Sequence, residues 1–182
     1  KGELEISALW QPQSAVHSED DLYRFAAAVE QQANHPIAKA IVHAAEQKML
    51  EIPTALFAKM EVGQGIQAKL EQVGTIKVGK PDYCGLILPK NLEDIWQIAS
   101  IVAVSINDEP IGAFALMDTL KNDSLHAIQR LQQQNIDVVI MSGDQQSVVD
   151  YIAKQLGIKK AFGGLSPRDK AEQIQKLKAQ GH

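Results

Sequence analysis

Apolar residues in the first half of the chain follow two spacings, one typical of helices and one typical of strands. After Ser18 they recur at i, i+3, i+4 and i+7, at Leu22, Phe25, Ala26 and Val29. This spacing places them on one face of an amphipathic helix, and a serine directly before such a run is a common N-cap. We therefore expect a helix that begins after Ser18 and buries this face.

A second helical pattern begins at Pro36, directly after His35. Its apolar residues would lie on the buried side of the helix: Ile37, Ala40, Ile41 and Ala44. Proline keeps the preceding residue out of the α region, and it fits the first turn of a helix because its nitrogen carries no hydrogen. His35 is therefore expected at a joint between two helices, with its ring held by stiff backbone on both sides.

Short strand patterns follow in residues 57–79. Glycines at positions 63, 65, 74 and 79 separate the segments FAKMEVG, GIQAKLE and TIKVG. Strands divided by glycine turns at this spacing are typical of an antiparallel meander. GELEIS near the start is a further strand candidate, and NLEDIWQIA is the best helix candidate in the less regular residues 80–99.

From about residue 100 the strands become strongly apolar and begin to alternate with helices. SIVAVSIN and IGAFALMD flank the turn DEP, and a helix is expected at about 122–134 with Leu125, Ile128 and Leu131 inward. IDVVIMSGD is a continuous apolar run, as in a parallel strand buried on both faces. A helix at SVVDYIAKQLG, a short strand near KAFGG and a helix from Pro167 complete this half.

Alternation of strands and helices predicts right-handed crossovers and a parallel sheet. We therefore expect an α/β protein overall, divided into two domains. Residues 1–105 would form an α+β domain, an antiparallel sheet with helices. Residues 106–182 would form part of a doubly wound α/β domain.

Composition narrows the classes of function. The net charge of -4, from 18 basic and 22 acidic residues, argues against a surface for nucleic acid or anionic membranes. No apolar run approaches the roughly 20 residues that span a bilayer. Cys84 is the only cysteine and the five histidines show no i, i+4 pairing, so we expect no disulfide and no metal site. The start without methionine and the end just after a helix lead us to expect a piece of a larger protein.

The first candidate for chemistry is the turn Ser142-Gly143-Asp144 at the end of the IDVVIM strand. Ligands in open α/β sheets bind outside the carboxyl ends of strands. The Ser142 hydroxyl and the Gly143 amide could hold a phosphoryl oxygen there, helped by the N-terminus of the next helix. The alternative is a turn that only reverses the chain and caps that helix.

Two further groups are expected at the same kind of sheet edge. Lys170 lies in the first turn of the helix that begins at Pro167, where a cation opposes the helix dipole unless it faces an anion. Asp118 follows a buried strand and could bind Mg²⁺ or pair with Lys121. A solvated surface lysine and a helix cap with a surface ion pair are the alternatives.

The remaining constellation combines Glu30, His35 and the Gly63-Gln64-Gly65 segment. A lone Gly-x-Gly outside a strand–loop–helix unit is not a dinucleotide fingerprint. These groups would nevertheless suit a purine. The histidine ring could stack on it, the carboxylate could accept a hydrogen bond from its amine, and a strand without side chains would leave the backbone open to it. Alternatively, His35 caps a helix and the glycines are ordinary bulges.

Taken in order, these residues resemble the heavy-metal-transporting P-type ATPases over essentially the whole chain. That family carries an acidic residue five positions before His-Pro, then Gly-x-Gly-[Ile/Val] and Val-Gly, in a nucleotide-binding domain. Its phosphorylation domain carries Asp-x-x-[Lys/Arg], Thr-Gly-Asp and Pro-x-x-Lys. The matching residues here are Glu30, His35-Pro36, Gly63-Gln64-Gly65-Ile66, Val78-Gly79, Asp118 to Lys121, Ser142-Gly143-Asp144 and Pro167 to Lys170.

The resemblance implies a nucleotide-binding domain followed by part of a haloacid-dehalogenase-like phosphorylation domain, without its first and last motif strands. ATP and Mg²⁺ would be the cofactors. The partners would be the membrane and actuator domains of the same transporter and a metallochaperone, on the cytoplasmic side of an inner or plasma membrane. Glu30, His35, Pro36, Gly63, Gly65, Ile66, Gly79 and Lys80 would bind the nucleotide, and Asp118, Ser142, Gly143, Asp144 and Lys170 would serve phosphoryl transfer.

The same resemblance implies copper or zinc, cadmium and lead as cargo classes. The family's phosphorylated Asp-Lys-Thr-Gly-Thr segment does not occur in these 182 residues, so we expect the chain alone to bind ATP weakly and to be inactive. Lys80 stands where the family often has asparagine, and Ser142 where it has threonine. The rival interpretations are a soluble haloacid-dehalogenase-type phosphatase and a regulatory nucleotide-binding module.

Overall fold

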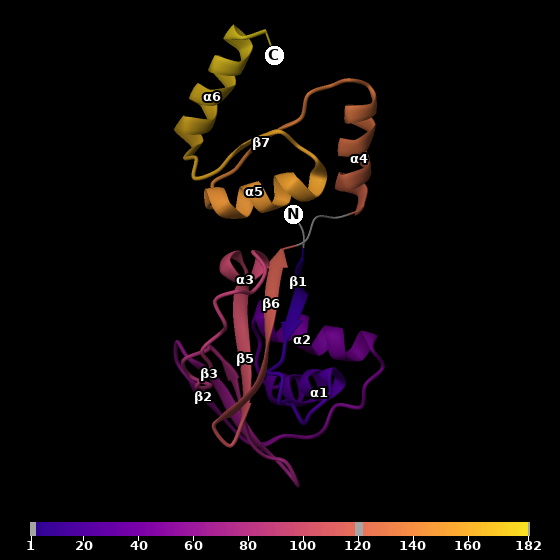
Figure 1. The fold of residues 1–182 in the computed structure, drawn as a ribbon, viewed down its shortest axis with the longest axis vertical. Helices are drawn as coiled ribbons and strands as arrows, with labels where there is room; N and C mark the ends of the chain where they lie inside the picture. The colour runs from indigo at the N-terminus through magenta and orange to yellow at the C-terminus, as the bar shows by residue number, and fades with distance from the viewer. Residues whose placement is uncertain (1–2, 119–121, 182) are drawn as a thin grey trace. The chain divides into compact units, whose positions relative to one another are not determined.

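The computed structural model describes residues 3–118 and 122–181, coloured along the chain in Figure 1. These residues form two compact units, which divide at residues 119 and 120. Both α-helices and β-strands occur in each unit, as expected for an α/β protein.

The first unit is built on a six-stranded, fully antiparallel sheet. Its strands lie in the order β1-β6-β5-β4-β3-β2, so that β1 and β2 are the edges. Their bounds are β1 Leu4–Trp10, β2 Leu56–Glu61, β3 Gly65–Leu70, β4 Gly74–Gly79, β5 Ser100–Ile106 and β6 Glu109–Asp118. The predicted meander of residues 57–79 is confirmed as β2, β3 and β4.

Two helices, α1 (Glu19–Glu30) and α2 (Pro36–Gln47), pack against this sheet (Figure 1). Leu22 of α1 and Ile41 of α2 are fully buried in one core with strand residues such as Ile76 and Phe114. The segment after β4 packs against the sheet, where the Cys84 sulfur lies 3.5 Å from the Lys77 carbonyl oxygen of β4 and 3.4 Å from the Ala103 carbonyl oxygen of β5.

Local signals explain where the two helices begin. The Ser18 hydroxyl accepts a hydrogen bond from the Asp21 amide at 3.1 Å, and the Asp21 carboxylate accepts one from the Ser18 amide at 3.2 Å. This reciprocal capping box satisfies two amides that an unfinished helix end leaves without partners. The predicted start after Ser18 and the predicted start at Pro36 are both confirmed.

The structure corrects the division of the chain at residues 105 and 106. Strand β6 does not open a parallel sheet; it pairs antiparallel with β5 and with β1 of the first unit. Asn107 and Asp108 connect β5 to β6 with φ angles of 50° and 68°, the left-handed pair typical of a tight hairpin. The predicted helix at NLEDIWQIA is also shorter, a single turn at α3 (Ile95–Ile98).

The second unit contains the expected alternation of strands and helices. Its elements are α4 (Asn122–Gln133), β7 (Val139–Met141), α5 (Gln146–Leu156), β8 (Lys160–Phe162) and α6 (Pro167–Ala179). Strands β7 and β8 are parallel, joined by α5, and this confirms the predicted strand–helix–strand unit. Val149 and Ala153 of α5 are buried.

Candidate functional site

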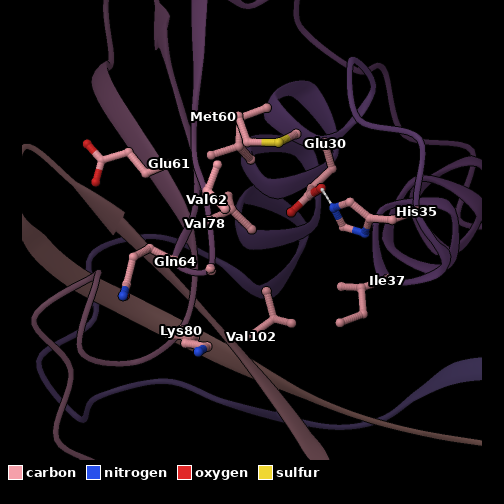
Figure 2. A pocket seen from close by; sticks show the side chains of 14 residues that line it. Glu30, His35, Ile37, Met60, Glu61, Val62, Gln64, Val78, Lys80 and Val102 are labelled. Atoms are coloured by element: carbon pink, nitrogen blue, oxygen red, sulfur yellow. Dashed lines mark ion pairs between the residues drawn. The ribbon is translucent and has the colours of Figure 1, made fainter.

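A cavity of about 360 Å³ opens in the first unit where the β2–β3 hairpin faces the end of α1 and the start of α2. Figure 2 shows side chains from both helices and several strands around it. This volume lies in the range of roughly 300–1,000 Å³ that small-molecule sites occupy. Its lining residues are Glu30, His35, Ile37, Met60, Glu61, Val62, Gly63, Gln64, Gly65, Ile66, Val78, Gly79, Lys80 and Val102.

His35 combines the two roles that the sequence left open. It is the N-cap of α2, with φ -141° and ψ 164°, and its Nδ1 accepts a hydrogen bond from the Ala38 amide at 3.2 Å. Because Nδ1 accepts, the proton of the neutral ring belongs on Nε2. Nε2 lies 3.5 Å from Oε2 of Glu30, the contact drawn as a dashed line in Figure 2. One ring nitrogen therefore fixes the ring while the other faces the cavity side.

Glu30 ends α1 with its side chain turned into the structure. The residue is only 3% exposed, and its Oε2 atom has no hydrogen-bond partner among the described residues. Burial raises the pKa of this carboxyl from 4.5 to about 7, because a low-dielectric surrounding disfavours the charged form. A buried acceptor without a partner is energetically unfavourable, and a ligand group that donates a hydrogen bond to it would remove this cost.

Glycine is required beside the cavity for two different structural reasons. Gly63 has φ +76°, and a Cβ added there would meet nothing within 4 Å. Gly65 and Gly79 pair directly across β3 and β4. A Cβ on Gly65 would lie 2.3 Å from the Val78 carbonyl oxygen and 3.0 Å from the Tyr83 ring. Gly63 thus provides a turn, whereas Gly65 and Gly79 allow two strands to approach closely.

Of the remaining predicted nucleotide-binding residues, Ile66 and Lys80 line this cavity, whereas Pro36 does not. Ile66 is buried at 5% exposure, and Lys80 is exposed directly after β4. Pro36 occupies the first turn of α2 and so holds His35 in its capping conformation. Figure 2 shows Lys80 and the Glu30–His35 pair at separate places around the opening.

The sequence interpretation missed the apolar part of the wall. Ile37, Met60, Val62, Val78 and Val102 supply it, and Val62 is 95% exposed in the turn between β2 and β3. Alternation along β3 and β4 could have placed Ile66 and Val78 on one face, since their register is direct. No local sequence pattern identifies Met60 or Val102 as cavity residues, because they reach the cavity from strands whose order depends on the whole sheet.

The second unit brings the Ser142 turn next to the start of α6. The Ser142 amide donates to the Phe162 carbonyl at 2.9 Å, and the Ser142 carbonyl accepts from the Leu165 amide at 3.0 Å. The Ser142 hydroxyl accepts from the Asp144 amide at 3.1 Å, while Gly143 and Asp144 are exposed. The serine therefore caps its own turn. The helix α5 that follows has Gln145 at its N-cap without a side-chain hydrogen bond.

Lys170 lies in the first turn of α6 and is half-buried, with its amide donating to the Ser166 carbonyl at 3.0 Å. The helix begins with a second capping box, between Ser166 and Asp169, and hydrogen bonds from Ser166 lower the pKa of the Asp169 carboxyl. The capping box and Pro167 are two independent local signals for the start of this helix.

Asp118 is the last residue of β6, where it pairs with Leu4 and is exposed. It belongs to the first unit, whereas Ser142, Gly143, Asp144 and Lys170 belong to the second. Its suggested partner Lys121 lies outside the described residues.

Within residues 3–118 and 122–181, no three His, Cys, Asp or Glu side chains are grouped to hold a metal ion. In the same residues, no helix has both the length and the apolar character needed to cross a bilayer. The cavity at Glu30 and His35 combines polar groups with an apolar wall, and this combination suits an organic ligand.

A family model for haloacid dehalogenase-like hydrolases matches residues 4–182. The chain belongs to this family. This match confirms the predicted haloacid-dehalogenase-like fold. The predicted resemblance to heavy-metal P-type ATPases is confirmed by curated relatives of that class.

Among curated relatives, the chain is 94% identical over 182 residues to a probable cation-transporting ATPase of Haemophilus influenzae, covering 100% of the chain and 25% of that protein. It is 35% identical to a copper-exporting P-type ATPase of Bacillus subtilis, over 90% of the chain and 21% of the relative. It is 40% identical to a zinc/cadmium/lead-transporting P-type ATPase of Escherichia coli, over 88% of the chain and 22% of the relative. This haloacid dehalogenase-like chain spans about a quarter or less of these proteins.

Solved structures of ATPases of the same class also match this chain. A zinc-transporting PIB-type ATPase in an E2.Pi state superimposes with a TM-score of 0.81 and 32% identity, over 98% of this chain and 29% of the other. The catalytic domain of the CPx-ATPase CopB-B, solved in a study of conformational changes upon nucleotide binding, matches with a TM-score of 0.58 and 28% identity, over 99% of this chain and 62% of the other.

Proposed function

We propose that this chain is the cytoplasmic ATP-binding region of an ATP-driven heavy-metal cation exporter, of the copper or the zinc/cadmium/lead class. Residues 3–118 would hold the nucleotide, and residues 122–181 would form part of the phosphorylation domain. Cation-transporting ATPases among the relatives support this proposal. The other membrane and actuator domains of the transporter would be partners, and a metallochaperone a further one.

One observation carries the nucleotide site. Oε2 of Glu30 is buried without a hydrogen-bond partner in the described structure, and it lies 3.5 Å from a histidine ring that lines the cavity. An adenine amine is a hydrogen-bond donor, and its flat ring could rest against the imidazole and the apolar side chains of Val78 and Val102. The base would thus satisfy the one polar atom that folding leaves unsatisfied there.

In the second unit, the amide of the exposed residue Gly143 and the ammonium of the half-buried Lys170 would face the γ-phosphate as its charge shifts during transfer. A lysine and an amide aimed at developing negative charge stabilise such a transition state electrostatically. Ser142 would keep the turn in shape through its bond to the Asp144 amide. Asp118 and Asp144 are exposed carboxylates, and both would serve the same transfer.

Mg²⁺ would arrive together with ATP, whose phosphates supply most of its ligands. Among the described residues, no three His, Cys, Asp or Glu side chains are grouped to hold a metal ion. The phosphorylated aspartate of the resembling family is not supplied by these 182 residues. We expect the isolated chain to bind ATP without measurable hydrolysis of ATP or of a simple phosphomonoester. Phosphate release at a steady rate would favour a soluble phosphatase instead.

Variants of His35 test the nucleotide site directly. His35→Asn keeps a side chain that caps helices well but removes the ring, so the free energy of unfolding should change little. ATP binding should weaken by about 1 kcal/mol, roughly fivefold, because the stacking surface is lost. His35→Ala should lose both the ring and the cap, with an additional cost of about 1 kcal/mol in stability.

The matched control is His43→Ala, an exposed histidine of the same helix that does not line the cavity. Nucleotide titrations followed by NMR provide the readout. Shifts in the resonances of His35 and Gly65 on addition of ATP are expected. Equal ATP affinity of wild type and His35→Asn, with no shift at these residues, would reject the site.

A further inference from the structure

The side-chain amide of Gln146, the first residue of α5, is bound to the end of β8. Its Oε1 accepts a hydrogen bond from the Gly163 amide at 2.7 Å, and its Nε2 donates to the Ala161 carbonyl at 3.2 Å. Nε2 also donates to the Asp150 carboxylate, one turn further along α5, at 2.7 Å. The opposite orientation of the amide would set a donor against the Gly163 N–H and an acceptor against two oxygens, so these partners fix it.

The chain after β8 passes close over the start of α5. A Cβ on Gly163 would lie 2.7 Å from the Gln146 Cα and 2.9 Å from the Asp144 carbonyl oxygen. The next amide, that of Gly164, donates to the same Asp144 carbonyl at 2.6 Å. A residue with a side chain would not fit at Gly163 unless the main chain moved. Gln146 therefore meets this loop at close range through both its main chain and its side chain.

This contact joins two segments that each lead into a helix. The Ser142-Gly143-Asp144 turn comes shortly before α5, and the loop of residues 163–166 leads directly into α6. Two main-chain hydrogen bonds already connect the loop to the turn. Gln146 adds a side-chain link from α5 to the start of the same loop. The turn, the loop and the first turn of α6, which contains Lys170, are therefore held as one piece.

Stability alone does not explain this arrangement. All three side-chain hydrogen bonds of Gln146 are exposed to solvent. Water could satisfy the same groups, so each bond contributes little net free energy to folding. Water would not, however, fix the direction in which the loop leaves β8. A side chain that is bound to helix, strand and loop at once does fix this direction, and precise placement matters most where chemistry occurs.

We propose that Gln146 is a positioning residue for phosphoryl transfer, which locks the loop of residues 163–166 onto the Ser142-Gly143-Asp144 turn. The Gly143 amide and Lys170 would then reach the γ-phosphate with a fixed spacing. Groups that stabilise developing charge act best when they are held in place before the reaction. The inference rests on the function proposed for the second unit, and it does not involve the nucleotide cavity of the first unit.

Hydrogen exchange followed by NMR tests the link in the 182-residue chain. Gln146→Met keeps the length and the helix propensity of the side chain but removes its amide. The amides of Gly163 and Gly164 should exchange about tenfold faster in this variant, while ATP affinity stays at the wild-type value. Gln155→Met is the matched control, because Gln155 is exposed in the same helix and makes no side-chain hydrogen bond within the described residues.

Kinetics of the full transporter test the role of Gln146 in the reaction. ATP hydrolysis is measured in the presence of Zn²⁺ or of Cu⁺, for the wild type and both variants. Gln146→Met should lower kcat roughly tenfold and leave the KM for ATP unchanged, because only the transfer step depends on Gln146. Gln155→Met should have the kcat and the KM of the wild type.

Three results would overturn the inference. One is exchange of the Gly163 and Gly164 amides at the wild-type rate in Gln146→Met. Another is faster exchange with an unchanged kcat, since the link would then be structural only. The third is a raised KM at unchanged kcat, which would place Gln146 in nucleotide binding. If the wild-type transporter does not hydrolyse ATP with either metal, the proposed function itself fails, and the role of Gln146 with it.

Discussion

Replacing Glu30 by glutamine will stabilise the first unit by up to about 3 kcal/mol at pH 8 and change its stability little at pH 5. Burial raises the pKa of this carboxyl from 4.5 to about 7. Between these two values the folded protein holds a proton that the unfolded chain has already released. The unfolding free energy therefore falls as the pH rises from about 4.5 to about 7, and above that range the whole penalty of a buried carboxylate is present. Glutamine has the same shape and no charge to bury.

Denaturant unfolding of wild type and Glu30→Gln at both pH values measures this difference. Trp10 and Trp96 are the two tryptophans of the chain, and both belong to the first unit, so their fluorescence reports on the unit that contains Glu30. Glu46→Gln, at an exposed position of α2, is the control and should show no such pH dependence. An equal effect of Glu30→Gln at pH 5 and pH 8 would contradict the assigned burial of the charge.

Alanine at Gly65 is expected to destabilise the first unit by about 1–3 kcal/mol and to abolish ligand binding at the cavity, because overpacking of a closed interior moves the backbone. The added Cβ would lie 2.3 Å from the Val78 carbonyl oxygen and 2.8 Å from the Gly79 Cα. Both neighbours are main-chain atoms that cannot swing aside. Strands β3 and β4 would have to separate, and both line the cavity.

Gly63→Ala is the matched comparison, two residues earlier. Its φ of +76° makes alanine unfavourable by about 1 kcal/mol, but a Cβ there meets open space. Stability should therefore fall slightly while ATP binding persists. The two variants are compared by chemical denaturation and by ATP titration. If they lose stability and affinity equally, the close pairing of Gly65 with Gly79 does not hold the cavity in shape.

Helix starts were predictable because their causes are local. Ser18 caps α1, Pro36 opens α2, and Pro167 opens α6, each within one turn of the backbone that it organises. The residues that surround the cavity were predictable in part for the same reason, since Glu30 and His35 flank one short connection between helices. What the sequence motifs could not predict was that His35 would cap the helix and line the cavity at once.

The placement of β6 shows why the sequence could not predict how the strands pair or where the first unit ends. Its apolar residues suit a strand covered on both faces, and such a run is compatible with either a parallel or an antiparallel neighbour. The partner that decides the matter is β1, which lies more than a hundred residues away along the chain, as the pairing of Leu4 with Asp118 shows. The two units therefore divide at residues 119 and 120 instead of at the expected residues 105 and 106.

By itself, the sequence determined the kinds of element, most of their starts, and the set of residues that carry the family resemblance, because caps, turns and periodic apolar positions act over a few residues. Only the tertiary structure decided that Glu30 is buried without a hydrogen-bond partner in the described residues, and that Lys80 lines the same cavity. Burial and charge pairing depend on which distant strands and helices pack together, and no local pattern carries that information.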